Sequence, residues 1–160
     1  MGHCINAFLG RTDRINSLSK TWLRSPIQLS QGLSMLFLTE ELYDEINASA
    51  HIDNEAPFVR FTFFTPAIAR LLEEHSHQGK LAYIETDYAG GAGTQMAVLY
   101  ENGKQKFPPV VTEDFKIWTP SDERAINIVL KGFGVQKLSG KDEFDSIGLG
   151  NFRDMYDGEV

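Results

Sequence analysis

Two carboxylates stand beside a glycine-rich stretch in the middle of the chain. Glu85 and Asp87 are two residues apart, so both side chains lie on one face of a β-strand. A carboxylate pair of this kind can serve in general acid–base catalysis or bind a hard metal ion. Glycines follow at positions 90, 91 and 93, where a backbone can pass close to a ligand. One hypothesis is therefore a small enzyme or ligand-binding domain centred on Glu85, Asp87, Gln95 and the loop 90–93.

The glycine-rich stretch does not match a phosphate-binding loop of the Walker type. That loop needs a lysine and a hydroxyl residue directly after its last glycine, followed by a helix. Here Thr94 and Gln95 follow, and then a strand pattern. In the structural alternative, Asp87 accepts hydrogen bonds from backbone N–H groups at the end of a strand, and the glycines connect two strands.

Other side chains with catalytic or ligand-binding potential lack suitable neighbours. His75 and His77 are two residues apart near the end of an expected helix, where their side chains diverge. Cys4 is the single cysteine, which excludes an intrachain disulfide, and we expect it in the core. No serine stands in a G-x-S-x-G pattern. We expect no catalytic residue, no metal site and no cofactor.

The C-terminal segment from residue 139 interleaves acidic and apolar side chains. It holds six acidic residues and two basic ones. In one interpretation its apolar residues dock on the domain and its carboxylates are solvated. In the other it is a recognition surface, on which aromatic anchors lie among acids that steer a basic partner. The predicted partner-binding residues are Asp142, Glu143, Asp145, Asp154 and Asp157, the anchors Phe152 and Tyr156, and a second patch of Glu85 and Asp87.

Composition and charge limit the class of protein. A net charge of −7 over 160 residues argues against direct nucleic-acid binding, because phosphates would be repelled and no run of Lys or Arg offers a basic patch. No apolar run approaches the roughly 20 residues that span a bilayer, and the N-terminus does not look like a secretion signal. We expect a soluble cytoplasmic protein with one domain over residues 1–160. Its oligomeric state stays open.

The patterns of apolar residues and turn signals predict an α+β domain, with a mostly antiparallel sheet and helices packed on one face. Asn102-Gly103 predicts a hairpin, since both residues tolerate positive φ. Thr65-Pro66 predicts the start of a helix. The expected strands cover residues 4–9, 33–38, 58–64, 80–88, 94–101 and 104–107, and the expected helices cover 12–20, 39–48, 65–79 and 119–132.

Three segments share a pattern with small acidic α+β proteins of bacteria: YIETDYAGGAGTQMAVLYENGK (83–104), AINIVLKGFGV (125–135) and DEFDSIGLGNFRDM (142–155). In these segments the chain resembles immunity proteins of polymorphic toxins, including contact-dependent growth-inhibition systems. The resemblance implies a non-enzymatic antitoxin that binds a cognate toxin at its active site or at an adjacent surface. If that toxin is a nuclease, its basic cleft would suit an acidic inhibitor. A self-associating protein that pairs through the edge of the 102–103 hairpin is a further alternative.

Overall fold

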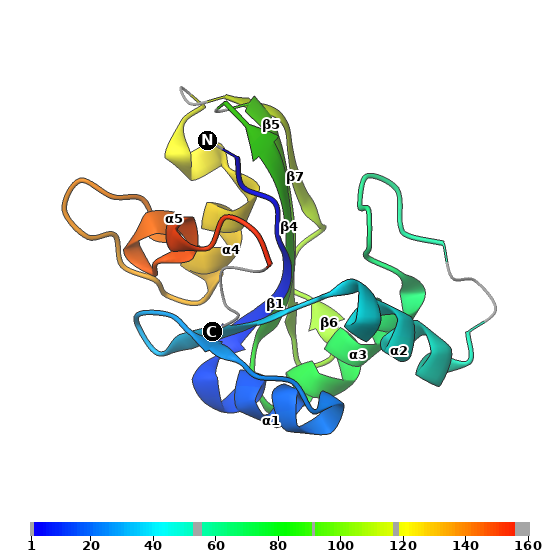
Figure 1. Cartoon of the computed structure of the whole chain (residues 1–160). Coiled ribbons are helices and arrows are strands. Elements are labelled where there is room, and N and C mark those ends of the chain that lie inside the picture. The colour runs from blue at the N-terminus through cyan, green and yellow to red at the C-terminus, as the bar shows by residue number, and fades with distance from the viewer. Residues whose placement is uncertain (1, 53–55, 91, 117–118, 156–160) are drawn as a thin grey trace.

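The computed structural model describes residues 2–52, 56–90, 92–116 and 119–155. Its strands are β1 (Asn6–Arg11), β2 (Ile27–Gln28), β3 (Leu33–Phe37), β4 (Leu81–Ala89), β5 (Ala92–Glu101), β6 (Lys104–Gln105) and β7 (Val110–Lys116). They form one antiparallel sheet in the order β2-β3-β1-β4-β5, and both β6 and β7 pair with the outer edge of β5. The long β4–β5 pair forms the upright centre of the molecule (Figure 1).

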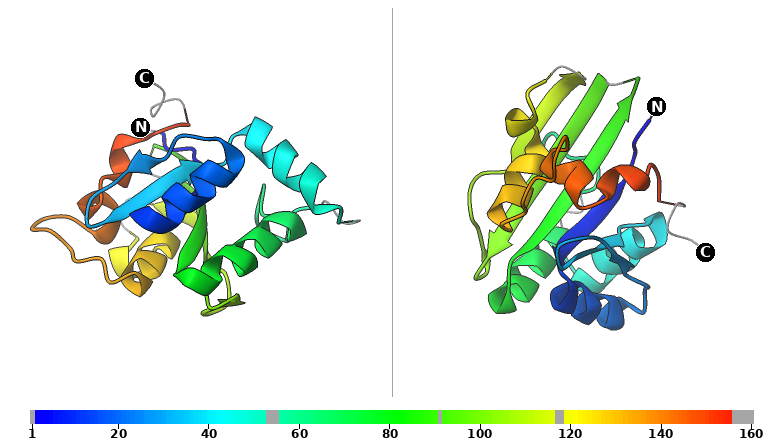
Figure 2. Two further views of the ribbon diagram at one scale, coloured as in Figure 1. Left: turned by 90° about the horizontal axis from the view of Figure 1, so that it is seen from below. Right: turned by 90° about the vertical axis from the view of Figure 1, so that its left-hand side faces the viewer.

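Five α-helices flank the sheet within the described ranges. They are α1 (Thr12–Trp22), α2 (Glu40–Ala50), α3 (Pro66–His75), α4 (Ala125–Gly132) and the single turn α5 (Glu143–Ser146). Short 3₁₀ turns are η1 (Ser76–Gln78), η2 (Ser121–Glu123) and η3 (Leu149–Asn151). Residues of α1, α2 and α3 pack in one core cluster, and residues of α4 and α5 pack in another on the opposite face of the sheet (Figure 2). We call these sides the α1–α3 face and the α4–α5 face.

The central strands are buried on both sides, which explains the two helical layers. In β1, Phe8 points into the α1–α3 cluster, whereas its neighbours Ala7 and Leu9 point into the α4–α5 cluster. Strands covered on both faces are buried without alternation, as in Leu33–Phe37, in which all five residues are buried and only Ser34 is polar. The predicted α+β class and antiparallel sheet are confirmed. The prediction that the helices pack on one face is wrong, because these unalternating strands need cover on both.

Several local predictions are confirmed by the backbone. The side chains of Thr39 and Thr65 each accept a hydrogen bond from the first turn of α2 and α3, and Pro66 opens α3. Asn102 and Gly103 have positive φ angles of 53° and 79° in the turn between β5 and β6. Turn chemistry is local, so sequence alone suffices to place these elements.

The strand predicted over residues 58–64 is absent, and β7 was not predicted. Residues 58–64 form a compact loop in which the Phe61 N–H donates to the Phe58 carbonyl and the Phe58 N–H donates to the Phe64 carbonyl. Arg60 sits there at a φ of +76°. Aromatic residues favour strands in general, but here their side chains fill the end of the α1–α3 cluster. Strand β7 begins directly after Pro108-Pro109, which suggested a break in regular structure.

Candidate functional site

Glu85 is a buried carboxylate that holds the 58–64 loop against the sheet. Only 2% of the residue is exposed. The Thr62 N–H donates to its Oε1 atom and the Phe63 N–H to its Oε2 atom, both at 2.8 Å. The Tyr83 hydroxyl also donates to Oε2, at 2.7 Å. The charge is therefore compensated inside the protein, and Glu85 is a structural anchor that offers no contact to a partner.

Asp87, the second carboxylate of the predicted pair, lies on the same face and is exposed. The pairing of β1 with β4 continues to the bridge between His3 and Tyr88, so Cys4 stands opposite Asp87. On the far side of Cys4, an isolated bridge brings in Asp154 from the C-terminal segment. Two carboxylates more than sixty residues apart in the sequence thus flank one exposed thiol. The expectation that Cys4 is a core residue is wrong, because the segment before β1 runs along the edge of the covered region.

The ionisation of Cys4 reflects this acidic environment. Burial raises the pKa of the Cys4 thiol, and the negative charges of Asp87 and Asp154 raise it further. A thiol that burial and two nearby carboxylates keep protonated is a poor nucleophile. Cys4 therefore only lies between Asp87 and Asp154, and its surroundings do not suit covalent catalysis.

The line of acids continues across the sheet to β7. Asp87 pairs with Thr94 of β5, and β7 lies beside β5 at this level. Glu113 of β7 is exposed and forms an ion pair with Arg60 of the 58–64 loop, at 3.3 Å, which places it on the α1–α3 face. We call the exposed carboxylates of Asp154, Asp87 and Glu113 the acidic row.

A polar pocket of about 180 Å³ lies at the same end of the sheet but on the α4–α5 face. Two of the predicted partner-binding acids, Asp142 and Asp145, line this pocket. The structure therefore divides the tail acids between two faces. The other polar residues of the lining are His3, Tyr88, Gln95, Arg124 and Arg153.

Asp142 connects α5 to α4 through its side-chain hydrogen bonds. Its Oδ1 atom accepts a hydrogen bond from the Asp145 N–H as the N-cap of α5, and its Oδ2 atom accepts one from the Asn127 amide. The Arg124 guanidinium lies 3.6 Å from the same Oδ2 atom. Asp145 is more exposed, and burial followed by the charge of Asp142 raises its pKa. Asp142 is mainly structural, while Asp145 faces the pocket.

Tyr88, beside Asp145, gives the pocket a measurable pH signature. Burial, with a further contribution from the charge of Asp145, raises the pKa of Tyr88 to about 12. An unfolded chain ionises tyrosine near pH 10, so this contribution to stability is complete below about pH 10 and is lost as the pH rises towards 12. We expect stability to fall over this window, and to fall less in Tyr88→Phe. The free energy of unfolding, measured with denaturant at several pH values, shows this fall. An equal fall in both proteins would contradict the raised pKa of Tyr88.

The remaining predicted site residues are less available to a partner. Glu143 is 2% exposed and its Oε1 atom lies 4.0 Å from the Lys131 ammonium group, so it acts within the fold. Phe152 is half-buried against the α4–α5 cluster. Tyr156 and Asp157 lie outside the described residues.

The alternative site around Glu85, Asp87 and Gln95 is not assembled. Gln95 pairs with Thr86, so its side chain points to the face opposite Glu85 and Asp87. There its Oε1 atom accepts a hydrogen bond from the Ile126 N–H at the start of α4. Among the described residues, no group of three or more His, Cys, Asp or Glu side chains is arranged to hold a metal ion.

The sequence did not indicate that Glu113, Cys4 and the exposed side chains of the 58–64 loop belong to one surface. Their proximity depends on the register of β1, β4, β5 and β7, and no local sequence signal indicates that register.

No helix in the described ranges is long and apolar enough to cross a membrane. No protein-family model, no curated protein and no solved structure matches this chain.

Proposed function

We propose that this chain is a cytoplasmic immunity-type protein that binds and neutralises a basic toxin domain through the acidic row. The observation that carries the proposal is the convergence of Asp87, Glu113 and Asp154 on one exposed face from three distant parts of the sequence. In an acidic chain, carboxylates gathered on one face create a directional negative potential, which speeds encounter with a basic partner.

The sheet gives this surface a fixed shape. Asp87 is on β4 and Glu113 is on β7, and both strands pair with β5. Asp154 is held beside Cys4 by the hydrogen bond from the Cys4 N–H to the Arg153 carbonyl, at 2.7 Å. Groups held by a rigid scaffold lose little conformational entropy when a partner binds. A preorganised charged face suits an inhibitor whose only task is tight association.

A second candidate function is the binding of a small polar ligand in the pocket on the α4–α5 face. The observation in its favour is the raised pKa of Asp145 in a concave site that also holds Tyr88 and Arg124. Its mixture of guanidinium and carboxylate groups would suit a zwitterion more than a strongly charged ligand. This candidate predicts a ligand-dependent function that is indifferent to changes on the acidic row.

Charge reversal on the acidic row tests the proposed function. The double variant Asp87→Lys/Asp154→Lys is expected to slow association with the toxin by about tenfold or more at low salt, because the steering potential is removed. The association rate should also become less dependent on salt. Both positions are exposed, so the fold should be retained. The association rate is measured by surface plasmon resonance with the purified partner at two salt concentrations.

The control is Asp44→Lys, a reversal of the same sign on the exposed surface of α2. It changes the net charge but not the acidic row, so its association rate should stay within about threefold of that of the unmodified chain. If the double variant associates as fast as this control, the row is not the interface and the pocket on the α4–α5 face becomes the leading candidate.

A further inference from the structure

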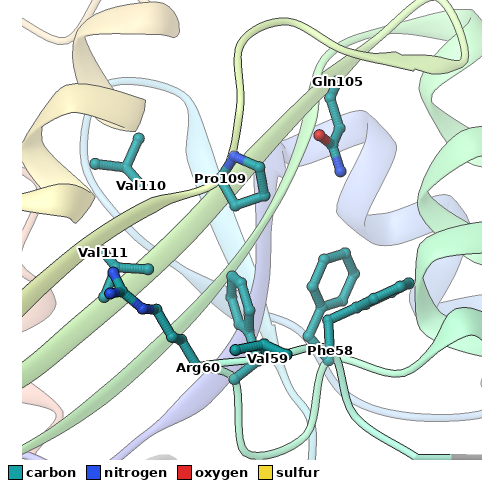
Figure 3. A pocket seen from close by; sticks show the side chains of 9 residues that line it. Phe58, Val59, Arg60, Gln105, Pro109, Val110 and Val111 are labelled. Carbon is teal, nitrogen blue, oxygen red and sulfur yellow. The ribbon is translucent and has the colours of Figure 1, made fainter.

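A groove of about 600 Å³ lies between the turn at residues 58–61 and the start of β7. Phe58 and Val59 form one wall, and Pro109 with Val111 forms the other (Figure 3). Val59 is 88% exposed and Phe58 is 44% exposed, although both are large apolar residues. Exposed apolar side chains that line a concave site are typical of surfaces covered by a partner.

We infer that this groove is the apolar anchor site of the same interface, and that it accepts a bulky apolar side chain from a partner segment that also carries Lys or Arg. The inference rests on the proposed function and adds the chemistry of the segment that is recognised. A volume of about 600 Å³ accommodates an aromatic side chain and part of its backbone.

Charge complementarity specifies the residues that flank this side chain. Arg60 is a cation that lines the groove, and its guanidinium is paired with Glu113 at 3.3 Å. Glu113 is also the end of the acidic row, so the row leads from Asp154 and Asp87 directly to the rim of the groove. A segment that places its apolar side chain in the groove would lay its neighbouring residues along these carboxylates. Lysine or arginine is favoured there, and glutamate or aspartate is repelled.

The groove wall is rigid enough to act as an anchor site. The buried carboxylate of Glu85 fixes the backbone at Thr62 and Phe63, and the Phe58 N–H is bonded to the Phe64 carbonyl at 2.8 Å. Below the rim, the rings of Phe61 and Phe64 pack edge to face with centroids 4.8 Å apart. A wall held in this way does not need to be ordered when a partner binds, which is a property of interface hot spots.

The test is a titration of the full isotope-labelled chain with three capped short peptides, followed by NMR. The first peptide has a central phenylalanine flanked by lysines, the second replaces the lysines with glutamates, and the third replaces the phenylalanine with alanine. We expect the first to bind about tenfold or more tightly than either of the others, and to shift the amide signals of Val59 and Val111. Equal binding of the lysine peptides with phenylalanine and alanine would overturn the inference.

Two double variants test whether Phe58 and Val59 bind the peptide. Phe58→Ala/Val59→Ala should lower the affinity for the phenylalanine peptide by about tenfold. The control Leu23→Ala/Leu138→Ala removes exposed apolar side chains elsewhere and should leave this affinity unchanged. Failure of the inference and failure of the proposed function are distinguishable. If charge reversal slows toxin association but the groove variant binds the toxin normally, the groove is not part of the interface and the proposed function stands. If charge reversal has no effect, the proposed function fails.

Discussion

Replacing Glu85 with alanine is expected to lower the free energy of unfolding by about 3 kcal/mol, because it removes a buried charged acceptor from one buried and two part-buried donors. The N–H groups of Thr62 and Phe63 and the hydroxyl of Tyr83 would lose their partner together. The loop 58–64 would then detach from the sheet. This loss should exceed that of any other single carboxylate on the α1–α3 face, because the other acids described there are exposed.

Equilibrium unfolding in urea measures the effect, with Asp87→Ala as the matched control. Asp87 is the next carboxylate on the same face of β4, but it is exposed, so its removal should change stability by no more than about 0.5 kcal/mol. Similar values for the two variants would show that the hydrogen bonds of Glu85 contribute little to stability and do not preorganise the groove wall.

Replacing Gly93 with alanine is the second large expected effect, with a loss of about 3 kcal/mol. The backbone of Gly93 has a φ of +152°, and an added Cβ would overlap the carbonyl oxygen of Asp87 and the Cα and Cβ atoms of Tyr88. These are backbone and near-backbone atoms of the paired strand, which cannot move aside as a flexible side chain would. The end of the β4–β5 pair, including Asp87, would have to shift.

Gly90→Ala is the control, since Gly90 lies three residues before Gly93, between β4 and β5, and a Cβ added there would meet no atom within 4 Å. Its φ of +60° imposes only a conformational cost of about 1–2 kcal/mol. Thermal unfolding of both variants should therefore show a clearly larger drop for Gly93→Ala. A larger drop for Gly90→Ala would mean that conformational strain, not close approach of the backbone, explains the glycines.

The sequence was a good guide to elements with local causes. The caps at Thr39 and Thr65, the turn at Asn102-Gly103 and the apolar runs of the central strands all act over a few residues, and each is where its pattern predicted. The 58–64 loop was mistaken for a strand because its aromatic residues favour strands. Its true conformation depends on Glu85, more than twenty residues away in the chain, which accepts the N–H groups that a strand would have used.

The candidate site was predictable only in part. Asp87 and Asp154 were both selected as acids of a recognition surface, but nothing in the sequence indicated that Cys4 lies between them. Glu85 was selected for its spacing from Asp87. Strand periodicity correctly placed the two carboxylates on one face, but it does not report that a loop covers the first and leaves the second exposed. Whether a side chain is covered depends on the tertiary structure, so the exposure of these two carboxylates could not be predicted from the sequence.

The most direct test of the acidic row is affinity capture from a bacterial lysate, with the unmodified chain, Asp87→Lys/Asp154→Lys and Asp44→Lys immobilised in parallel. We expect the unmodified chain and Asp44→Lys to retain one basic protein in stoichiometric amount and to release it as salt rises. We expect the double variant not to retain it. That protein should arrest growth when expressed alone and be harmless when this chain is expressed with it. Equal retention by the double variant, or no retained protein on a correctly folded unmodified chain, would show that the acidic row does not bind a basic toxin.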